Sequence, residues 1–137
     1  MKALDSILLV DDDAIANYLH ERLIKKTQLA REVITKANGR EAIEYIKERY
    51  KTMRTLPSLI ILDLSMPVMN GIDFLKEICQ SDLLFANHIP IAILTSSDHP
   101  DDIKRVKEIK NCFYLLKPLS MAKLTDTIEK CFSQTAC

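Results

Sequence analysis

Five short runs of branched apolar residues are spaced along the chain, and each is followed by a segment in which apolar residues recur at helical spacing. Such runs are typical of strands that are buried on both faces, as in a parallel sheet. Strand and helix alternate five times, which predicts right-handed crossovers and helices on both faces of the sheet. The expected strands are residues 7–10, 33–35, 59–64, 89–95 and 113–116.

The segments after these runs predict five amphipathic helices whose apolar sides cover the sheet. The first is marked by Ile15, Leu19 and Leu23, and Asp13 is its expected N-cap. The others are marked by Ala42, Ile46 and Tyr50; by Ile72, Leu75 and Cys79; by Ile103, Val106 and Ile109; and by Leu124, Ile128 and Cys131. Cap or turn residues precede them, namely Asn38 with Gly39, Asn70 with Gly71, Asp98 with Pro100, and Ser120.

Length and charge narrow the class of protein. The chain has 137 residues, 47% of them apolar, which suits one domain and leaves no room for a separate output domain. Lys plus Arg number 19 and balance 19 Asp plus Glu, so no direct binding to nucleic acid or to a membrane surface is expected. No apolar run approaches the roughly 20 residues of a membrane span, and the N-terminus lacks a signal-peptide pattern. We therefore expect a cytoplasmic protein that binds a protein or a small ligand.

Carboxylates lie at the ends of two expected strands. Asp11 and Asp12 directly follow the first strand, and Asp63 lies at the end of the third. Because the carboxyl ends of parallel strands share one edge of a sheet, the three side chains would crowd one pocket if these strands are neighbours. Hard carboxylate oxygens suit Mg²⁺, and a backbone carbonyl near Ser65 would complete such a site. A helix cap explains Asp13 well, but it does not explain Asp63.

An aspartate beside Mg²⁺ can attack a phosphoryl group and form an acyl phosphate. Lys117 ends the fifth apolar run and is the expected fixed cation; it precedes Pro118, where a cis peptide bond is considered. Thr95 ends the fourth run and offers a hydroxyl that could turn toward a phosphoryl oxygen. Either residue alone is an ordinary strand-end residue. Together with the three aspartates they favour phosphoryl chemistry.

Four motifs occur in order along the chain: ILLVDDD at 7–13, LIILDLSMPVMNG at 59–71, IAILTSS at 91–97 and YLLKP at 114–118. With these motifs the chain resembles the receiver domains of two-component response regulators, in particular single-domain regulators of the chemotaxis type. The resemblance covers about residues 4–133 and implies one receiver domain, residues 1–137, with no output domain. It also implies an α/β fold with a doubly wound, five-stranded parallel sheet of order 2-1-3-4-5, the flavodoxin-like (βα)5 arrangement.

The resemblance implies a role for each acidic residue of the predicted pocket. Asp63 would be the phosphoacceptor. Asp11, Asp12 and Asp63 would bind the cofactor Mg²⁺, together with the backbone carbonyl of Ser65. Lys117 would hold a phosphoryl oxygen. The chain would then be a switch rather than an enzyme, catalysing only its own phosphorylation and dephosphorylation.

The resemblance also implies how the switch is set and transmitted. Thr95 would hold a second phosphoryl oxygen, Ser96 would leave room for the phosphoryl group, and Tyr114 would change rotamer as Thr95 shifts. The output surface would be formed by the fourth helix, the fifth strand and the fifth helix. The expected partners are a sensor histidine kinase or a histidine phosphotransfer protein, an unknown downstream protein, and a second copy of the chain in a homodimer.

Three other functions stay open. A phosphatase of the haloacid dehalogenase type has its second acid two residues after the nucleophile, where this chain has Ser65. A flavodoxin-like FMN protein needs a phosphate loop of small residues, and the chain has only Gly39 and Gly71. A scaffold on the receiver fold that works without phosphorylation is the main alternative.

The histidines and cysteines suggest no further chemistry. His20, His88 and His99 have no partner at metal-ligand spacing, so they are expected to be ordinary surface or loop residues. Cys79, Cys112 and Cys131 lie in apolar segments, where a free thiol behaves as a small hydrophobic group.

Overall fold

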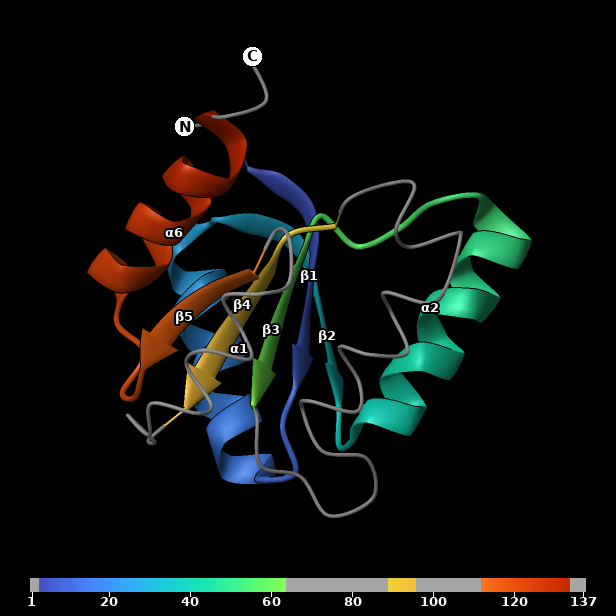
Figure 1. The fold of residues 1–137 in the computed structure, drawn as a ribbon, viewed down its shortest axis with the longest axis horizontal. Coiled ribbons are helices and arrows are strands. Elements are labelled where there is room, and N and C mark those ends of the chain that lie inside the picture. Colours follow the sequence, from blue (N-terminus) through green and yellow to red (C-terminus); the bar gives the residue numbers. More distant parts are fainter. Residues whose placement is uncertain (1–2, 64–88, 96–111, 134–137) are drawn as a thin grey trace.

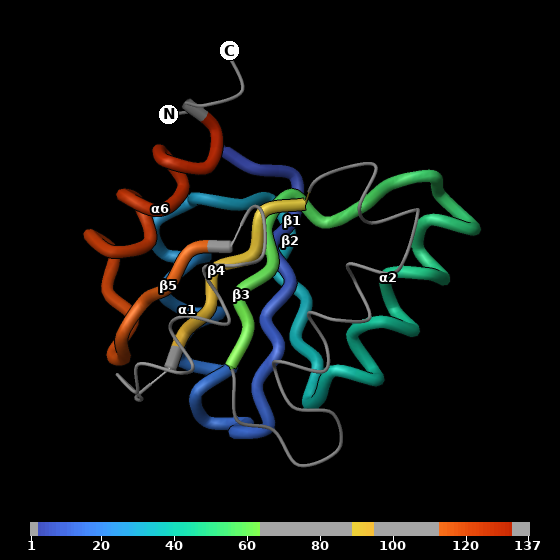
Figure 2. The backbone as a smooth tube through the Cα atoms, in the orientation of Figure 1, coloured from blue at the N-terminus to red at the C-terminus, as the bar shows by residue number. Residues whose placement is uncertain are grey.

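The computed structural model describes residues 3–63, 89–95 and 112–133. Its strands form one parallel sheet, and their order confirms the predicted 2-1-3-4-5 arrangement. All five strands end at the same edge of the sheet, the lower edge in Figure 2. The strands are β1 (Leu4–Val10), β2 (Ala30–Lys36), β3 (Leu59–Asp63), β4 (Ile91–Thr95) and β5 (Cys112–Leu116).

The strand bounds differ from the prediction. β1 begins at Leu4 rather than at residue 7, and β5 begins at Cys112 rather than at residue 113. Two other strands differ for reasons that the sequence explains. β2 begins at Ala30 and runs to Lys36, because an end strand of the sheet need not be continuously apolar and can carry charged residues such as Glu32. β4 begins at Ile91, because Pro90 has no N–H to donate to a ladder. The carbonyl of Pro90 still accepts the N–H of Ile60 at 3.1 Å.

The described helices are α1 (Ala14–Thr27), α2 (Gly39–Met53) and α6 (Met121–Ser133). Their predicted caps are confirmed. Asp13 accepts the N–H of Ile15 at 2.9 Å, Asn38 accepts that of Glu41 at 2.9 Å, and Ser120 accepts that of Lys123 at 3.1 Å. The third and fourth expected helices lie outside the described residues. Among the described helices, none combines the length and the apolar character needed to cross a membrane.

Two apolar clusters cover the two faces of the sheet, because alternate strand residues point to opposite sides. Leu8 and Val10 pack with α2 on one face, and Ile7 and Leu9 pack with α1 and α6 on the other (Figure 1). The expected inner faces of two helices are confirmed. In α2, Ala42 and Ile46 are fully buried, and in α6 Leu124 and Ile128 are buried and Cys131 is half-buried. Burial raises the pKa of the Cys131 thiol to about 11, as suits a small apolar side chain.

The predicted inner face of α1 is wrong. Ile15 and Leu19 are 70% and 56% exposed, whereas Asn17 and Ile24 are buried. The rotation of the helix follows from its contacts. Asn17 donates hydrogen bonds at the carboxyl ends of β1 and β2, and Ile24 packs into the apolar cluster on the α1 and α6 face of the sheet. Apolar spacing could not show this, because the inward face of α1 carries polar residues at two of its turns.

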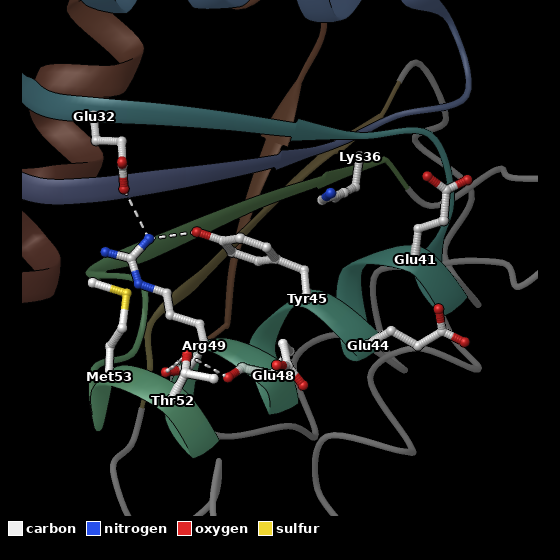
Figure 3. Close-up of a pocket in the computed structure, with 9 residues that line it drawn as sticks. All are labelled: Glu32, Lys36, Glu41, Glu44, Tyr45, Glu48, Arg49, Thr52 and Met53. Carbon is white, nitrogen blue, oxygen red and sulfur yellow. Dashed lines mark hydrogen bonds and ion pairs between the residues drawn. The ribbon is translucent and has the colours of Figure 1, made fainter.

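The edge strand β2 is connected to α2 by side chains. Arg49 donates to Glu32 at 2.8 Å and also to the hydroxyl of Tyr45, and the ammonium group of Lys36 lies 5.1 Å from the centre of the Tyr45 ring (Figure 3). These contacts border an open groove of about 620 Å³. Its lining comes only from β2 and α2, so it is separate from the acidic cluster described below.

Candidate functional site

Three aspartates meet where β1 and β3 end. The two strands are neighbours, with Val10 opposite Leu62, so Asp11 and Asp12 follow β1 beside Asp63. One carboxylate oxygen from each of the three lies within 4.8 Å of the others. Asp11 and Asp63 are buried, and Asp12 is exposed. The structure therefore brings together the carboxylates that the sequence placed at one edge.

The alternation of side chains along the strands explains why Lys117 lies beside the buried aspartates. Three apolar strand residues pack on the α1 and α6 side of the sheet, namely Leu9, Ile61 and Leu115. Two residues after each of them come Asp11, Asp63 and Lys117, in that order, so these three side chains point to the same side. The ammonium group of Lys117 lies 3.9 Å from Oδ2 of Asp11 and 3.7 Å from Oδ2 of Asp63. It faces both carboxylates without a close contact to either. The Lys117–Pro118 peptide bond is cis.

Burial makes negative charge costly in this pocket. Burial is the main reason that the pKa of Asp11 rises from 3.8 to about 6. The hydrogen bond from the backbone N–H of Asp13 lowers this pKa, the nearby carboxylate of Asp63 raises it, and the charge of Lys117 lowers it. Oδ1 of Asp11 accepts that N–H at 2.9 Å. The carboxylates are hard oxygen donors, and their charge exceeds what one lysine offsets. This donor set fits Mg²⁺, which prefers a few carboxylates and keeps several waters.

Asn17 is a residue of the site that the sequence analysis missed. It is only 8% exposed, and its Nδ2 donates to the backbone carbonyls of Asp11 at 2.9 Å and Lys36 at 3.4 Å. Its Oδ1 has no hydrogen-bond partner within the described residues. A buried acceptor left without a partner costs about 1–3 kcal/mol. A polar residue inside the first expected helix, four positions after the N-cap, was the only signal.

His20 was expected on the surface or in a loop, but it lies half-buried on the inward side of α1. Burial holds its pKa below the usual value, the charge of Lys117 adds to this, and Asp13 and Asp63 oppose it. His20 is therefore within the electrostatic field of the pocket. Its spacing from Asn17 and Ile24 places it on the same helix face, which the apolar pattern alone did not reveal.

The structure describes some of the other residues predicted for the site and not others. Thr95 is the last residue of β4, opposite Leu116 of β5. Tyr114 lies opposite Ile93 and is half-buried against the cluster on the α2 side. Ser65 and Ser96 lie outside the described residues, as does the side chain of Thr95. The roles predicted for these residues stay predictions.

The fold and the acidic cluster define a class of protein, and comparison with known proteins agrees with it. The family model described as the response regulator receiver domain matches residues 7–129. The chain therefore belongs to the receiver-domain family of two-component response regulators.

Several relatives are similar over most of their length. A crystal structure of a two-component response regulator from Cytophaga hutchinsonii has a TM-score of 0.87 and 29% identity, covering 96% of this chain and 99% of that one. The phosphorylated cyanobacterial phytochrome response regulator RcpA has a TM-score of 0.72 and 32% identity, covering 98% of both chains. The Mn²⁺-bound form of response regulator Rcp1 has a TM-score of 0.72 and 30% identity, covering 92% of this chain and 90% of that one. By sequence, Rcp1 from Synechocystis sp. is 29% identical over 90% of this chain and 83% of its own length.

Proposed function

We propose that this chain is a single-domain response regulator that accepts a phosphoryl group on Asp63 and later loses it by hydrolysis. The observation that carries the proposal is the position of Asp63, a buried carboxylate that faces Lys117 at 3.7 Å and shares its pocket with Asp11 and Asp12. Two relatives support it: RcpA has been crystallised in a phosphorylated form and Rcp1 in a Mn²⁺-bound form.

In this proposal Asp11, Asp12 and Asp63 hold Mg²⁺, with the backbone carbonyl of Ser65 as a further ligand. The ion would neutralise charge on the equatorial oxygens of the phosphoryl group. A carboxylate oxygen of Asp63 attacks phosphorus while the phosphorus–nitrogen bond of a phosphohistidine breaks, and the donor imidazole leaves with the electron pair. Lys117 and Thr95 hold phosphoryl oxygens. In the return reaction a water attacks phosphorus, which releases phosphate and restores the carboxylate.

The exposed apolar side of α1 suggests where the phosphodonor binds. Ile15, Tyr18 and Leu19 are 70%, 57% and 56% exposed, and they lie within two turns of the acidic residues that precede the helix. A group of large apolar side chains on a surface marks a contact with another protein. The donor histidine must reach Asp63, so we infer that a histidine kinase or a histidine phosphotransfer protein packs on this side of α1.

The output surface of the proposal includes β5 and α6, the latter being the fifth helix expected from the sequence. Leu116 and Met121 are 45% and 51% exposed there. Phosphorylation would draw Thr95 toward the pocket and shift the rotamer of Tyr114, which biases a two-state surface. A downstream protein or a second copy of the chain would bind the phosphorylated form.

Intact-mass spectrometry tests the proposal. The protein is incubated with acetyl phosphate, with and without Mg²⁺, beside Asp63→Asn and the control Asp5→Asn, whose side chain is 83% exposed in the native chain. We expect one phosphoryl adduct in the wild type and in Asp5→Asn, and none in Asp63→Asn or without metal. Absence of an adduct in every sample would favour the phosphorylation-independent scaffold.

A second experiment tests the proposed donor surface. The double variant Ile15→Ser and Leu19→Ser should accept phosphoryl groups from acetyl phosphate at the wild-type rate, because the pocket is intact. Transfer from a phosphorylated histidine phosphotransfer protein should slow at least tenfold. Equal transfer rates for the variant and the wild type would place the donor elsewhere.

A further inference from the structure

One buried side-chain amide joins three elements at the edge of the sheet that carries the acidic cluster. Nδ2 of Asn17 donates to the carbonyls of Asp11 and Lys36, at 2.9 and 3.4 Å. The carbonyl of Lys36 also accepts the N–H of Asp11, at 3.1 Å. Asn17 therefore connects α1 to the carboxyl ends of β1 and β2.

These contacts fix Asp11 on almost every side. Its N–H is bonded to Lys36, its C=O accepts from Asn17, and its Oδ1 accepts the N–H of Asp13 at 2.9 Å. Oδ2 of Asp11 faces Lys117 at 3.9 Å, and the carboxyl group of Asp11 also interacts with that of Asp63. The position of that oxygen is thus set by the backbone contacts, of which Asn17 supplies one.

Packing does not explain an asparagine at this place. The side chain is only 8% exposed, and its Oδ1 has no hydrogen-bond partner within the part of the chain that is described. A leucine of similar size would avoid that unpartnered acceptor. What asparagine adds is a donor, Nδ2, which reaches the carbonyl of Asp11 just after β1 and that of Lys36 at the end of β2.

We propose that Asn17 is a positioning residue for the metal site: it fixes the backbone of Asp11 so that the oxygens of Asp11 and Asp12 are held ready for a divalent cation. This inference rests on the proposed function, because it takes the acidic cluster to bind Mg²⁺. Residues that orient metal ligands without touching the metal typically contribute about 10–100-fold to metal affinity.

The test uses Asn17→Leu in the full chain, with Mg²⁺ affinity measured by isothermal titration calorimetry. We expect affinity to fall at least tenfold. In the metal-free protein, the amide protons of Asp11 and Asp13 should exchange at least tenfold faster. The urea midpoint should change little, because removing the unpartnered Oδ1 offsets the loss of the donor to the Asp11 carbonyl.

A matched control comes from the same helix. The hydroxyl of Thr27 donates to the carbonyls of Leu23 and Ile24, both at 3.0 Å, at the end of α1 away from the pocket. Thr27→Val should lose these bonds and keep the wild-type affinity for Mg²⁺. If Asn17→Leu does not fold, Asn17→Ala provides the same measurement, because it removes the donors without adding volume.

The outcomes separate this inference from the proposed function. Wild-type affinity in the Asn17 variant would overturn the positioning role and leave the proposed function in place. An equal loss of affinity in Thr27→Val would show a general effect of α1 and would also overturn it. Failure of the wild-type protein to bind Mg²⁺ would contradict the proposed function, and this inference with it.

Discussion

Two groups of charged side chains lie on different parts of the sheet and differ in how their charges are compensated. At the carboxyl ends of β1 and β3, Asp11 and Asp63 are buried, yet Lys117 lies 3.9 and 3.7 Å from them. Between β2 and α2, Arg49 lies 2.8 Å from Glu32, whose side chain is 56% exposed. The closer ion pair therefore has the more exposed carboxylate, although the side chain of Arg49, at 14% exposed, is less exposed than that of Lys117, at 33%.

The difference in charge compensation distinguishes the structural contact between Arg49 and Glu32 from the pocket that we propose to be reactive. In the pair between Arg49 and Glu32 the carboxylate is open to solvent, so the pair contributes little to stability although the two groups are close. In the pocket, burial removes solvation from two carboxylates, and one cation, Lys117, is shared between them, so the pKa of Asp11 rises to about 6. The fold thus leaves negative charge incompletely compensated at one place, where a divalent cation would bind favourably.

Replacing Lys117 by alanine should have the largest effect among the variants that test this comparison. Phosphorylation of Asp63 by acetyl phosphate should slow about 100-fold, because a fixed cation that faces the developing charge is lost. Mg²⁺ affinity should not fall, because Lys117 repels the ion. The rate is measured by intact mass and the affinity by calorimetry.

Lys130→Ala is the matched control, since Lys130 is 63% exposed and pairs with Asp126 one turn away. It should keep the wild-type rate. A wild-type rate in Lys117→Ala, or the same slowing in both variants, would contradict the role of Lys117.

The next effect is a loss of stability of the metal-free protein as pH rises. The pKa of Asp11 is about 6 in the folded protein and 3.8 as its ordinary value, so between these values the folded state binds more protons than the unfolded state. The free energy of unfolding should therefore decrease by about 2 kcal/mol between about pH 4 and pH 7. Mg²⁺ should reverse the loss at pH 7. Urea unfolding over this pH range measures it.

Asp11→Asn separates this effect from that of His20. The lowered pKa of His20 changes stability with pH in the opposite direction. Between that pKa and the ordinary histidine pKa the unfolded state binds more protons, so stability increases as pH rises. The variant keeps His20 and should lose the decrease with pH. The same decrease in Asp11→Asn would show that another group is responsible.

The smallest effect is expected at the exposed pair. Glu32→Gln removes the charge that Arg49 contacts and should lower the free energy of unfolding by about 0.2–1 kcal/mol. It should leave phosphorylation and Mg²⁺ affinity unchanged. Urea unfolding and intact mass measure the two quantities. A larger loss of stability, or slower phosphorylation, would remove the distinction between the two groups of charges.

Both the strand order of the sheet and the clustering of the three aspartates could be predicted, because both follow from local sequence pattern and sheet topology. Branched apolar runs marked all five strands, and the shared edge of a parallel sheet brought Asp11, Asp12 and Asp63 together. These inferences depend on local pattern and topology, which a single chain contains. The cap residues Asp13, Asn38 and Ser120 were predicted for the same local reason.

The rotation of α1 and the residues behind the pocket were not predictable in this way. Asn17 contacts the carbonyl of Lys36, 19 residues away, and that contact exists only once β1 and β2 are paired. With Asn17 and His20 turned inward, Ile15 and Leu19 turn outward, against their apolar spacing. A polar residue with a tertiary partner thus outweighs the hydrophobic pattern at this position.

The most direct test of the account identifies the residue that carries the phosphoryl group. The protein is treated with acetyl phosphate and Mg²⁺, and borohydride then reduces the acyl phosphate to an alcohol, which converts the modified aspartate to homoserine. Peptide mass spectrometry locates the homoserine. The account predicts homoserine at position 63 and an unmodified Asp63 when Mg²⁺ is omitted. Homoserine at position 11 or 12, or modification that does not require Mg²⁺, would contradict it.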